Sequence, residues 1–237
     1  MTSPANAPLA LLQRIEIESA PQPTAAVIWM HGLGASGDDF AAIVPELDLR
    51  GCAPIRFVFP HAPVMPVSIN NGYPMPAWYD IKNVDLVRQE DAAGIHASAR
   101  AIEALIAHEV ARGIAAKHIV LAGFSQGCAM ALHTGLRHPV RLAGIMALSG
   151  YLPLADTLAT ERHPANFNTP IYMAHGTGDP VVPLARAEGS RQALTALGHP
   201  VQWHTYPMPH SVHPQEVADI SRFLQSVLPS VQGAAQG

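Results

Sequence analysis

The sequence predicts a single α/β domain built on a mainly parallel sheet with helices on both faces. Short apolar runs of strand length alternate with longer helix-compatible segments along the 237 residues, a pattern typical of strand–helix–strand units. With 49% hydrophobic and 14% charged residues, the chain can bury a sizeable core. We find no internal repeat or linker, so residues 1–237 are assigned to one domain, with a flexible tail over about 229–237.

The expected strands are apolar runs too short for helices. They cover residues 9–18, 25–30, 56–60, 119–122, 142–148, 171–175 and 201–206. The first is interpreted as an edge strand, which Pro21 and Pro23 close. The segments at 25–30 and 119–122 are interpreted as buried strands.

The expected helices follow from apolar spacing and from stop signals. They cover residues 39–47, 86–111, 128–136, 183–197 and 214–228. Ser36 or Asp38 is expected to cap the first helix. Gly113 and Gly198 are expected to end the second and fourth. Residues 153–168 are interpreted as an irregular surface excursion.

Composition excludes several classes of function. Net charge is −4 without a basic run, so nucleic acid is not an expected partner. The sequence has no uninterrupted apolar stretch of about 18 residues, so we expect no membrane span. The N-terminus lacks a signal-peptide pattern and the two cysteines are expected to be reduced, which favours a cytoplasmic protein. The low charged fraction is compatible with a homodimer.

Cofactor and metal chemistry are not expected. The 13 histidines lack H-E-x-x-H spacing and there is no paired C-x-x-C. The Gly32-Leu33-Gly34 turn lacks the third glycine and the lysine of a phosphate loop. Cys128 lies among small helix-compatible residues, so we interpret it as a core residue.

The residues around Ser125 indicate nucleophilic chemistry. Gly123-Phe124-Ser125-Gln126-Gly127 matches G-x-S-x-G, and it follows an apolar strand and precedes a helix, which is the context of a nucleophile elbow. Such a turn exposes the serine hydroxyl, and the following helix directs its positive end toward a developing oxyanion. The alternative is a glycine-rich turn without chemistry.

A second glycine-rich turn follows the strand at 25–30. His31-Gly32-Leu33-Gly34 allows the backbone to approach a substrate and offer an N–H group. We assign the oxyanion hole to the backbone amides of Leu33 and Gln126. A structural strand-to-helix turn is the alternative.

The serine needs a histidine base and a carboxylate that orients it. In parallel sheets, reactive groups lie beyond the carboxyl ends of the strands. His210 follows the last expected strand and is preferred to His204, which lies within that strand, and to His213, which begins the final helix. Asp179, in a tight turn after the strand at 171–175, is preferred to Asp156. His175 is expected to brace the turn that carries Asp179.

Residues 61–80 form a long segment rich in Pro, Asn and Gly. Ordered loops of this length are often functional, so we expect it to fold over the cleft. Met75 or Trp78 would then line the substrate pocket. Equally, Trp78 could fill the core beneath the loop.

Five motifs together resemble the phospholipase/carboxylesterase family of α/β-hydrolases, which includes acyl-protein thioesterases and small bacterial carboxylesterases. The similarity extends over nearly the whole chain. It is carried by residues 27–34, 76–81, 121–127, 175–182 and 206–211. The resemblance implies an α/β-hydrolase fold, Ser125, Asp179 and His210 as the catalytic triad, Leu33 and Gln126 at the oxyanion hole, and Trp78 near the acyl pocket.

The resulting hypothesis is a serine carboxylesterase that hydrolyses short- to medium-chain esters through an acyl-enzyme. The substrate would be a small-molecule or lipid-like ester. An acyl-protein thioesterase or a lysophospholipase with the same triad is the nearest alternative, because the depth of the pocket decides between them. A non-catalytic module that binds an apolar ligand is the alternative from another class.

Overall fold

The computed structural model describes residues 10–83 and 90–231. Seven strands form one sheet in the order β1-β3-β2-β6-β7-β8-β9. β1 pairs antiparallel with β3, and all other neighbours are parallel, as the sequence predicts. The strands are β1 (Arg14–Glu18), β2 (Ala25–Met30), β3 (Ile55–Pro60), β6 (Ile119–Phe124), β7 (Gly144–Leu148), β8 (Ile171–Gly176) and β9 (Val201–Tyr206).

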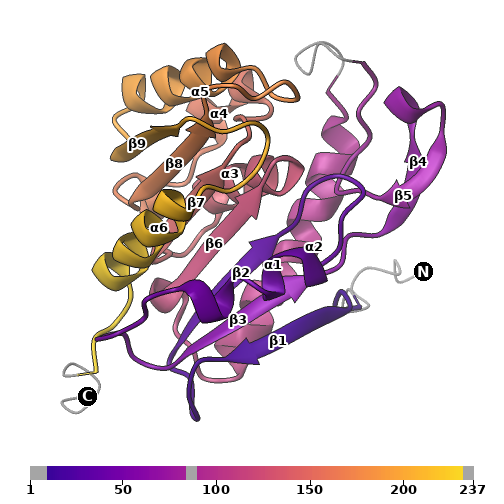
Figure 1. Ribbon diagram of the computed structural model, residues 1–237. Helices are drawn as coiled ribbons and strands as arrows, with labels where there is room; N and C mark the ends of the chain where they lie inside the picture. The colour runs from indigo at the N-terminus through magenta and orange to yellow at the C-terminus, as the bar shows by residue number, and fades with distance from the viewer. Residues whose placement is uncertain (1–9, 84–89, 232–237) are drawn as a thin grey trace.

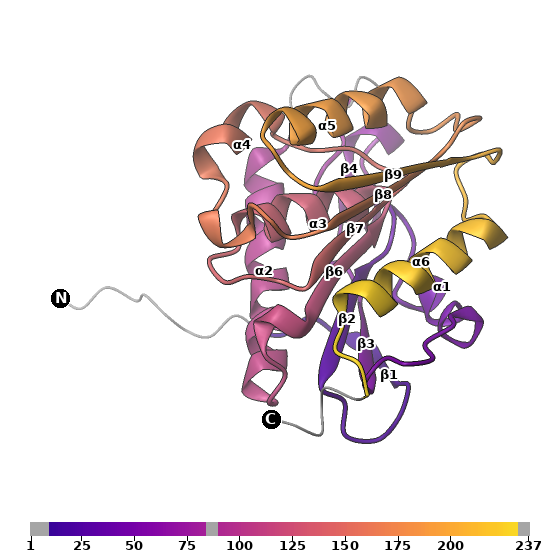
Figure 2. The same cartoon turned by 90° about the vertical axis from the view of Figure 1, so that its left-hand side faces the viewer.

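Helices cover both faces of this sheet (Figures 1 and 2). The long helix α2 and helix α3 lie on one face, whereas α1 and α6 lie on the other. The helices are α1 (Asp38–Ala41), α2 (Ala92–Ala111), α3 (Gln126–Arg137), α4 (Ala155–Glu161), α5 (Leu184–Ala196) and α6 (Pro214–Val227). This two-sided packing confirms the predicted α/β-hydrolase architecture.

The fully buried strands supply both halves of the core. In β2, alternate side chains point to opposite faces, so Ile28 and Met30 pack with α2 and α3 while Val27 and Trp29 pack with the cluster that contains α6. All six residues of β2 are buried. A continuous apolar run is what a parallel strand covered on both faces requires.

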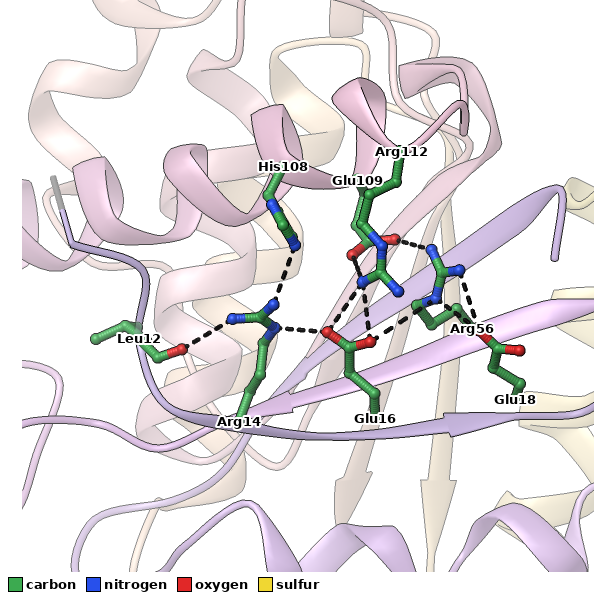
Figure 3. Close-up of polar contacts among 8 residues, drawn as sticks. All are labelled: Leu12, Arg14, Glu16, Glu18, Arg56, His108, Glu109 and Arg112. Atoms are coloured by element: carbon green, nitrogen blue, oxygen red, sulfur yellow. Dashed lines mark hydrogen bonds and ion pairs between the residues drawn. The ribbon is translucent and has the colours of Figure 1, made fainter. Parts of the chain in front are cut away.

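One face of the edge strand β1 carries an ion-pair network (Figure 3), whereas Ile15 and Ile17 on the other face pack against the core. Arg112 contacts Glu16 at 2.9 Å and Glu109 at 2.9 Å, and Arg56 contacts Glu109 at 2.7 Å. Glu109 is 1% exposed and Arg56 is 8% exposed. Each buried charge in the network faces an opposite charge. Because its members come from β1, β3 and the end of α2, the network joins these three elements.

One corner of this network has the residue types of a metal site. Ligand atoms of Glu16, His108 and Glu109 lie within 4.8 Å of one another. Guanidinium groups contact each of them: Arg14 lies 3.0 Å from His108, and Arg112 binds both carboxylates. These cations balance the carboxylate charge, so the cluster is explained as part of the network.

Several element boundaries differ from the sequence expectation. The helix expected at 39–47 is shortened to α1 and is followed by a 3-10 turn, η1 (Val44–Glu46), because Pro45 cannot donate a helical hydrogen bond. Gly37 caps α1, without a side-chain hydrogen bond, in place of Ser36 or Asp38. The expected starts of the first strand and of the second helix, at residues 9 and 86, lie outside the described residues.

The proline-rich segment at 61–80 is not a plain loop. It contains a hairpin of β4 (Val64–Val67) and β5 (Tyr73–Pro76), joined through the 3-10 turn η2 (Ser68–Asn70). Pro66 faces Pro74 in the register. A residue without an N–H group fits a non-hydrogen-bonded position of an antiparallel pair, so prolines do not prevent this hairpin.

Two further expectations are corrected. The excursion at 153–168 contains the short helix α4, anchored by the buried Leu158. Part of the expected tail is held in place, because Pro229 O accepts from Ala53 N at 2.8 Å and Val231 N donates to Gly51 O at 3.1 Å. Residues 232–237 of that tail lie outside the described residues.

Candidate active site

Ser125 lies at a sharp turn between β6 and α3. Its backbone has φ 55° and ψ −116°, a conformation that is costly for a residue with a side chain. A Cβ atom at Gly123 would lie 2.0 Å from Gly127 O, and one at Gly127 would lie 2.2 Å from Met30 O. Glycine is therefore required on both sides of the serine for the strand and helix to approach this closely.

The Ser125 hydroxyl is not used to cap the helix that follows it. Ser125 is the N-cap residue of α3, but its side chain makes no capping hydrogen bond. Among the residues that the structure describes, this hydroxyl has no hydrogen-bond partner, so the expected serine–histidine bond is not formed here. Catalytic hydrogen bonds are often long in unliganded enzymes and tighten when substrate binds.

Asp179 occupies the tight turn after β8. Its side chain is fully buried, and Oδ1 accepts hydrogen bonds from Val181 N at 2.8 Å and from Val182 N at 2.9 Å. These two N–H groups hold the carboxylate in a fixed position. Oδ2 lies 2.6 Å from His210 Nδ1, so the structure brings together the acid and the base that the sequence selects.

His210 lies in the loop between β9 and α6. Since a carboxylate can only accept, Nδ1 donates to Asp179 and Nε2 is left as the basic nitrogen. The imidazole ring lies 4.7 Å from the ring of Phe124, the residue before Ser125. This tilted ring contact holds the histidine beside the elbow.

His175, at the end of β8, supports the turn of Asp179. Its Nε2 donates to Val182 O at 2.8 Å and lies 3.4 Å from Asp179 Oδ2. Burial is the largest influence on His175 and lowers its pKa, which favours a neutral ring. The side chain therefore braces the loop, as the sequence analysis expects.

The turn that carries Leu33 is also held by a buried histidine. Ala62 N donates to His31 Nε2 at 3.0 Å, so Nδ1 must carry the hydrogen that is donated to Gly32 O at 2.7 Å. Burial lowers the pKa of His31 and keeps the ring neutral. Gly34 N donates to Pro76 O at 2.8 Å, which ties the same turn to β5.

Gln126 connects the elbow to the segment after β5, a role that the sequence analysis does not identify. Its side chain is buried; Oε1 accepts from Trp78 N at 2.8 Å, and Nε2 donates to Tyr79 O at 2.7 Å. Both contacts join residues that are more than 40 positions apart. Only the general observation that a buried glutamine needs partners could have suggested them.

Trp78 is part of the core. It is 1% exposed, its indole N–H donates to His31 O at 2.9 Å, and its carbonyl accepts from Ser98 Oγ. Trp78 is not among the residues that line the cavity at Ser125, whereas its neighbour Tyr79 is. The structure thus favours the alternative in which Trp78 packs beneath the loop.

Two separate hollows are lined by residues of the elbow. One is a cavity of about 430 Å³ that contains Ser125 together with the two residues of the expected oxyanion hole, Leu33 and Gln126. Its other lining residues are Ile69, Asn70, Tyr79, Ile81, Tyr151, Pro180, Val181, Val182 and Pro183. The second, of about 710 Å³, lies between α1 and α6 and includes Phe124 and His210.

Known proteins are similar to this chain in sequence and in fold. Residues 12–228 match the phospholipase/carboxylesterase family. The chain belongs to this family of α/β-hydrolases. Acyl-protein thioesterase 1 of Gibberella zeae is 43% identical over 89% of this chain and 94% of its own length. The protein of the same name from Neurospora crassa is 42% identical over 91% of each chain.

Solved structures agree with this membership. SOBER1 of Arabidopsis thaliana has a TM-score of 0.80 at 27% identity and covers 85% of this chain and 98% of its own. Esterase PE8 has a TM-score of 0.76 at 28% identity and covers 92% of this chain and all of its own. The chain is therefore an enzyme, a serine hydrolase of the carboxylic-ester class.

Two other features bear on this phospholipase/carboxylesterase family member. Cys128 is fully buried, and burial raises the pKa of its thiol, which disfavours the thiolate and any competing nucleophilic role. Within residues 10–83 and 90–231, no helix combines the length and the apolar character that crossing a bilayer requires.

Proposed function

We propose that this protein is a serine carboxylesterase that hydrolyses short- to medium-chain acyl esters. The observation that supports this most is the position of Ser125 in the wall of a largely apolar cavity of about 430 Å³. Such a cavity can hold an alkyl chain while the ester carbonyl remains at the serine. Asp179 and His210, 2.6 Å apart, supply the acid and the base.

In the proposed mechanism, His210 Nε2 takes the proton of Ser125 as its oxygen attacks the ester carbonyl. Asp179 keeps the hydrogen on Nδ1 and stabilises the imidazolium that forms. The backbone amides of Leu33 and Gln126 stabilise the oxyanion. Losing one such donor costs roughly 10²–10³ in turnover.

The leaving group receives its proton from His210, so it must lie on the side of that histidine. The hollow of about 710 Å³ on that side is open to groups of varied size. Water then enters the same place, gives a proton to His210 and hydrolyses the acyl-enzyme. Each proton taken by the base is returned to a leaving atom, so the cycle is balanced.

The test is the Ser125→Ala variant, measured with p-nitrophenyl butyrate and with a fluorophosphonate probe. Hydrolysis should fall by about 10⁴ or more, and covalent labelling should disappear. Ser211→Ala, which removes a hydroxyl next to His210, is the matched control and should retain both. Hydrolysis by Ser125→Ala at a tenth of the wild-type rate would exclude the assignment. Absence of labelling in the wild type would favour a non-catalytic binding module.

An acyl-protein thioesterase is the second candidate, and the relatives that are 42–43% identical carry this name. The open hollow beside His210 is compatible with a large leaving group such as a protein thiol. A series of p-nitrophenyl esters beside palmitoyl thioesters separates the two, since kcat/KM should peak at the natural acyl chain and leaving group. A peak on lysophospholipids would instead support a lysophospholipase.

A further inference from the structure

The cavity at Ser125 is largely apolar, but two tyrosines interrupt its wall. Tyr79 follows β5 and Tyr151 follows β7, and both line the cavity. Their hydroxyl groups lie 2.8 Å apart and form a hydrogen bond. Tyr79 is 2% exposed and Tyr151 is 4% exposed, so bulk water has little access to this pair.

This pair carries more hydrogen-bond donors than it uses. Burial raises the pKa of both hydroxyls, so both keep their hydrogens. The bond between them consumes one hydrogen, whichever residue donates. The other hydrogen makes no hydrogen bond within the described part of the chain.

A nearby carboxylate, Glu90, does not take that hydrogen, although its Oε1 is buried and has no hydrogen-bond partner among the described residues. Glu90 is close enough for its charge to influence the pKa of both tyrosines. Its Oε2 accepts from Leu154 N at 3.0 Å, and its Oε1 lies 4.0 Å from Arg186. Neither tyrosine hydroxyl donates to it. The remaining O–H group is therefore an unsatisfied donor in a buried place.

A second pair of tyrosines in the same molecule shows the satisfied arrangement. Tyr172 and Tyr206 also have hydroxyls 2.8 Å apart, but Tyr206 then donates to Asp219 Oδ2 at 2.6 Å. Both hydrogens of that pair are used. The difference is that the pair with the spare donor belongs to the wall of the substrate cavity.

We propose that the Tyr79–Tyr151 pair donates this hydrogen bond to the acyl chain of the substrate. This inference rests on the proposed function and extends it to the class of acyl group. A plain alkyl chain that reaches the pair excludes water and leaves the O–H group unpaired, which is unfavourable. An acyl group with an ether, hydroxyl or keto oxygen at that depth accepts the bond. Sites built around a hydrogen bond discriminate strongly against analogues that lack the partner.

The test compares p-nitrophenyl octanoate with ether analogues of equal length, in which one methylene beyond the third carbon is replaced by oxygen. The distance from the carbonyl keeps the intrinsic reactivity of the esters similar, and the leaving group is unchanged. At one position of the oxygen, the wild type should favour the ether by about tenfold in kcat/KM. The preference should be lost at the neighbouring positions.

The decisive variant is the double change Tyr79→Phe/Tyr151→Phe, which removes both hydroxyls and leaves no orphaned partner. It should lose the tenfold preference, so that the ether and the octanoate are hydrolysed with about equal kcat/KM. Each single change leaves one hydroxyl with a free hydrogen, so it should retain part of the preference. Tyr172→Phe, in the satisfied pair, is the control and should leave the preference unchanged.

A preference that is the same in the wild type and in the double variant would overturn the proposal. The proposal would also be overturned if the kcat/KM of the wild type were the same for every position of the ether oxygen. That measurement does not depend on the folding of any variant. Calorimetry with the methyl esters of the same acids and Ser125→Ala protein gives a second readout without turnover. If the wild type hydrolyses no ester, the proposed function fails, whereas equal binding of ether and alkyl esters rejects only the role of the tyrosines.

Discussion

The side chain of Gln126 should contribute substantially to the stability of the fold, in addition to the role of its backbone amide in the proposed chemistry. Replacing Gln126 by alanine removes the hydrogen-bond partners of Trp78 N, which lies 2.8 Å from Gln126 Oε1, and of Tyr79 O, which lies 2.7 Å from Gln126 Nε2. Each buried backbone group left without a partner costs about 1–3 kcal/mol, so the Gln126→Ala variant should lose roughly 2–6 kcal/mol. That is a large part of a typical unfolding free energy of about 5–15 kcal/mol.

The measurement is thermal and urea unfolding, followed by circular dichroism. A loss of this size corresponds to a fall in Tm of roughly 5–20 °C for a chain of this length. Because Tyr79 lines the cavity, the surviving activity should also show a higher KM and weaker discrimination between acyl chains. The backbone N–H of residue 126 is kept, so kcat should change less than KM.

Gln202→Ala is the matched control, since Gln202 is exposed on β9 and should change stability by less than about 0.5 kcal/mol. The reasoning fails if Gln126→Ala melts within 2 °C of the wild type, where 2 °C is about 1 kcal/mol or less. Such a result would mean that water or a shift of the loop satisfies both backbone groups.

Three further predictions concern the fold around the site. Glu109→Gln weakens the pairing of the buried Arg56 and should lower the unfolding free energy in urea by about 3 kcal/mol. Burial raises the pKa of Glu216 from an ordinary 4.5 to about 7, so the folded state binds the extra proton and stability falls as pH rises from 4.5 to 7. Glu216→Gln should flatten that dependence by about 3 kcal/mol. Gly127→Ala forces a contact with the β2 backbone and should cost about 1–3 kcal/mol or more, with loss of turnover.

Each of these has an internal control. Glu46 is exposed, so Glu46→Gln should leave the unfolding free energy and its pH dependence unchanged. If Glu46→Gln and Glu109→Gln destabilised the protein equally, the argument from the ion-pair network would be contradicted. If the unfolding free energy of Glu216→Gln still falls between pH 4.5 and 7 by as much as that of the wild type, Glu216 is not the cause of the pH dependence. A Cβ at Gly189, in α5, meets nothing within 4 Å, so Gly189→Ala should be neutral or stabilising by up to about 1 kcal/mol.

The features that the sequence predicts well are those encoded locally. The parallel sheet follows from apolar runs such as β2, and the elbow follows from glycines within two positions of Ser125. The hydrogen bond between Asp179 and His210 could also be anticipated, because parallel strands bring their carboxyl ends to one edge of the sheet.

What the sequence could not provide depends on side chains that meet across long distances in the chain. Gln126 bonds to residues 47 and 48 positions away, and the two cavity tyrosines are 72 positions apart. The position of Trp78 depended on whether its indole N–H would find a buried acceptor, and His31 O is that acceptor. The β4–β5 hairpin was not predicted, because its prolines indicated a loop. That these prolines occupy compatible register positions is visible only in the folded chain.

The two hollows on either side of the elbow have different sizes and linings, and this has a consequence for the reaction. On the proposed mechanism, the first product departs from the side of His210 while the acyl group stays in the narrower cavity beside Ser125. Any small alcohol that enters the vacated side can then compete with water for the same carbonyl. The enzyme should consequently transfer acyl groups between alcohols, with the donor chosen strictly and the acceptor chosen loosely.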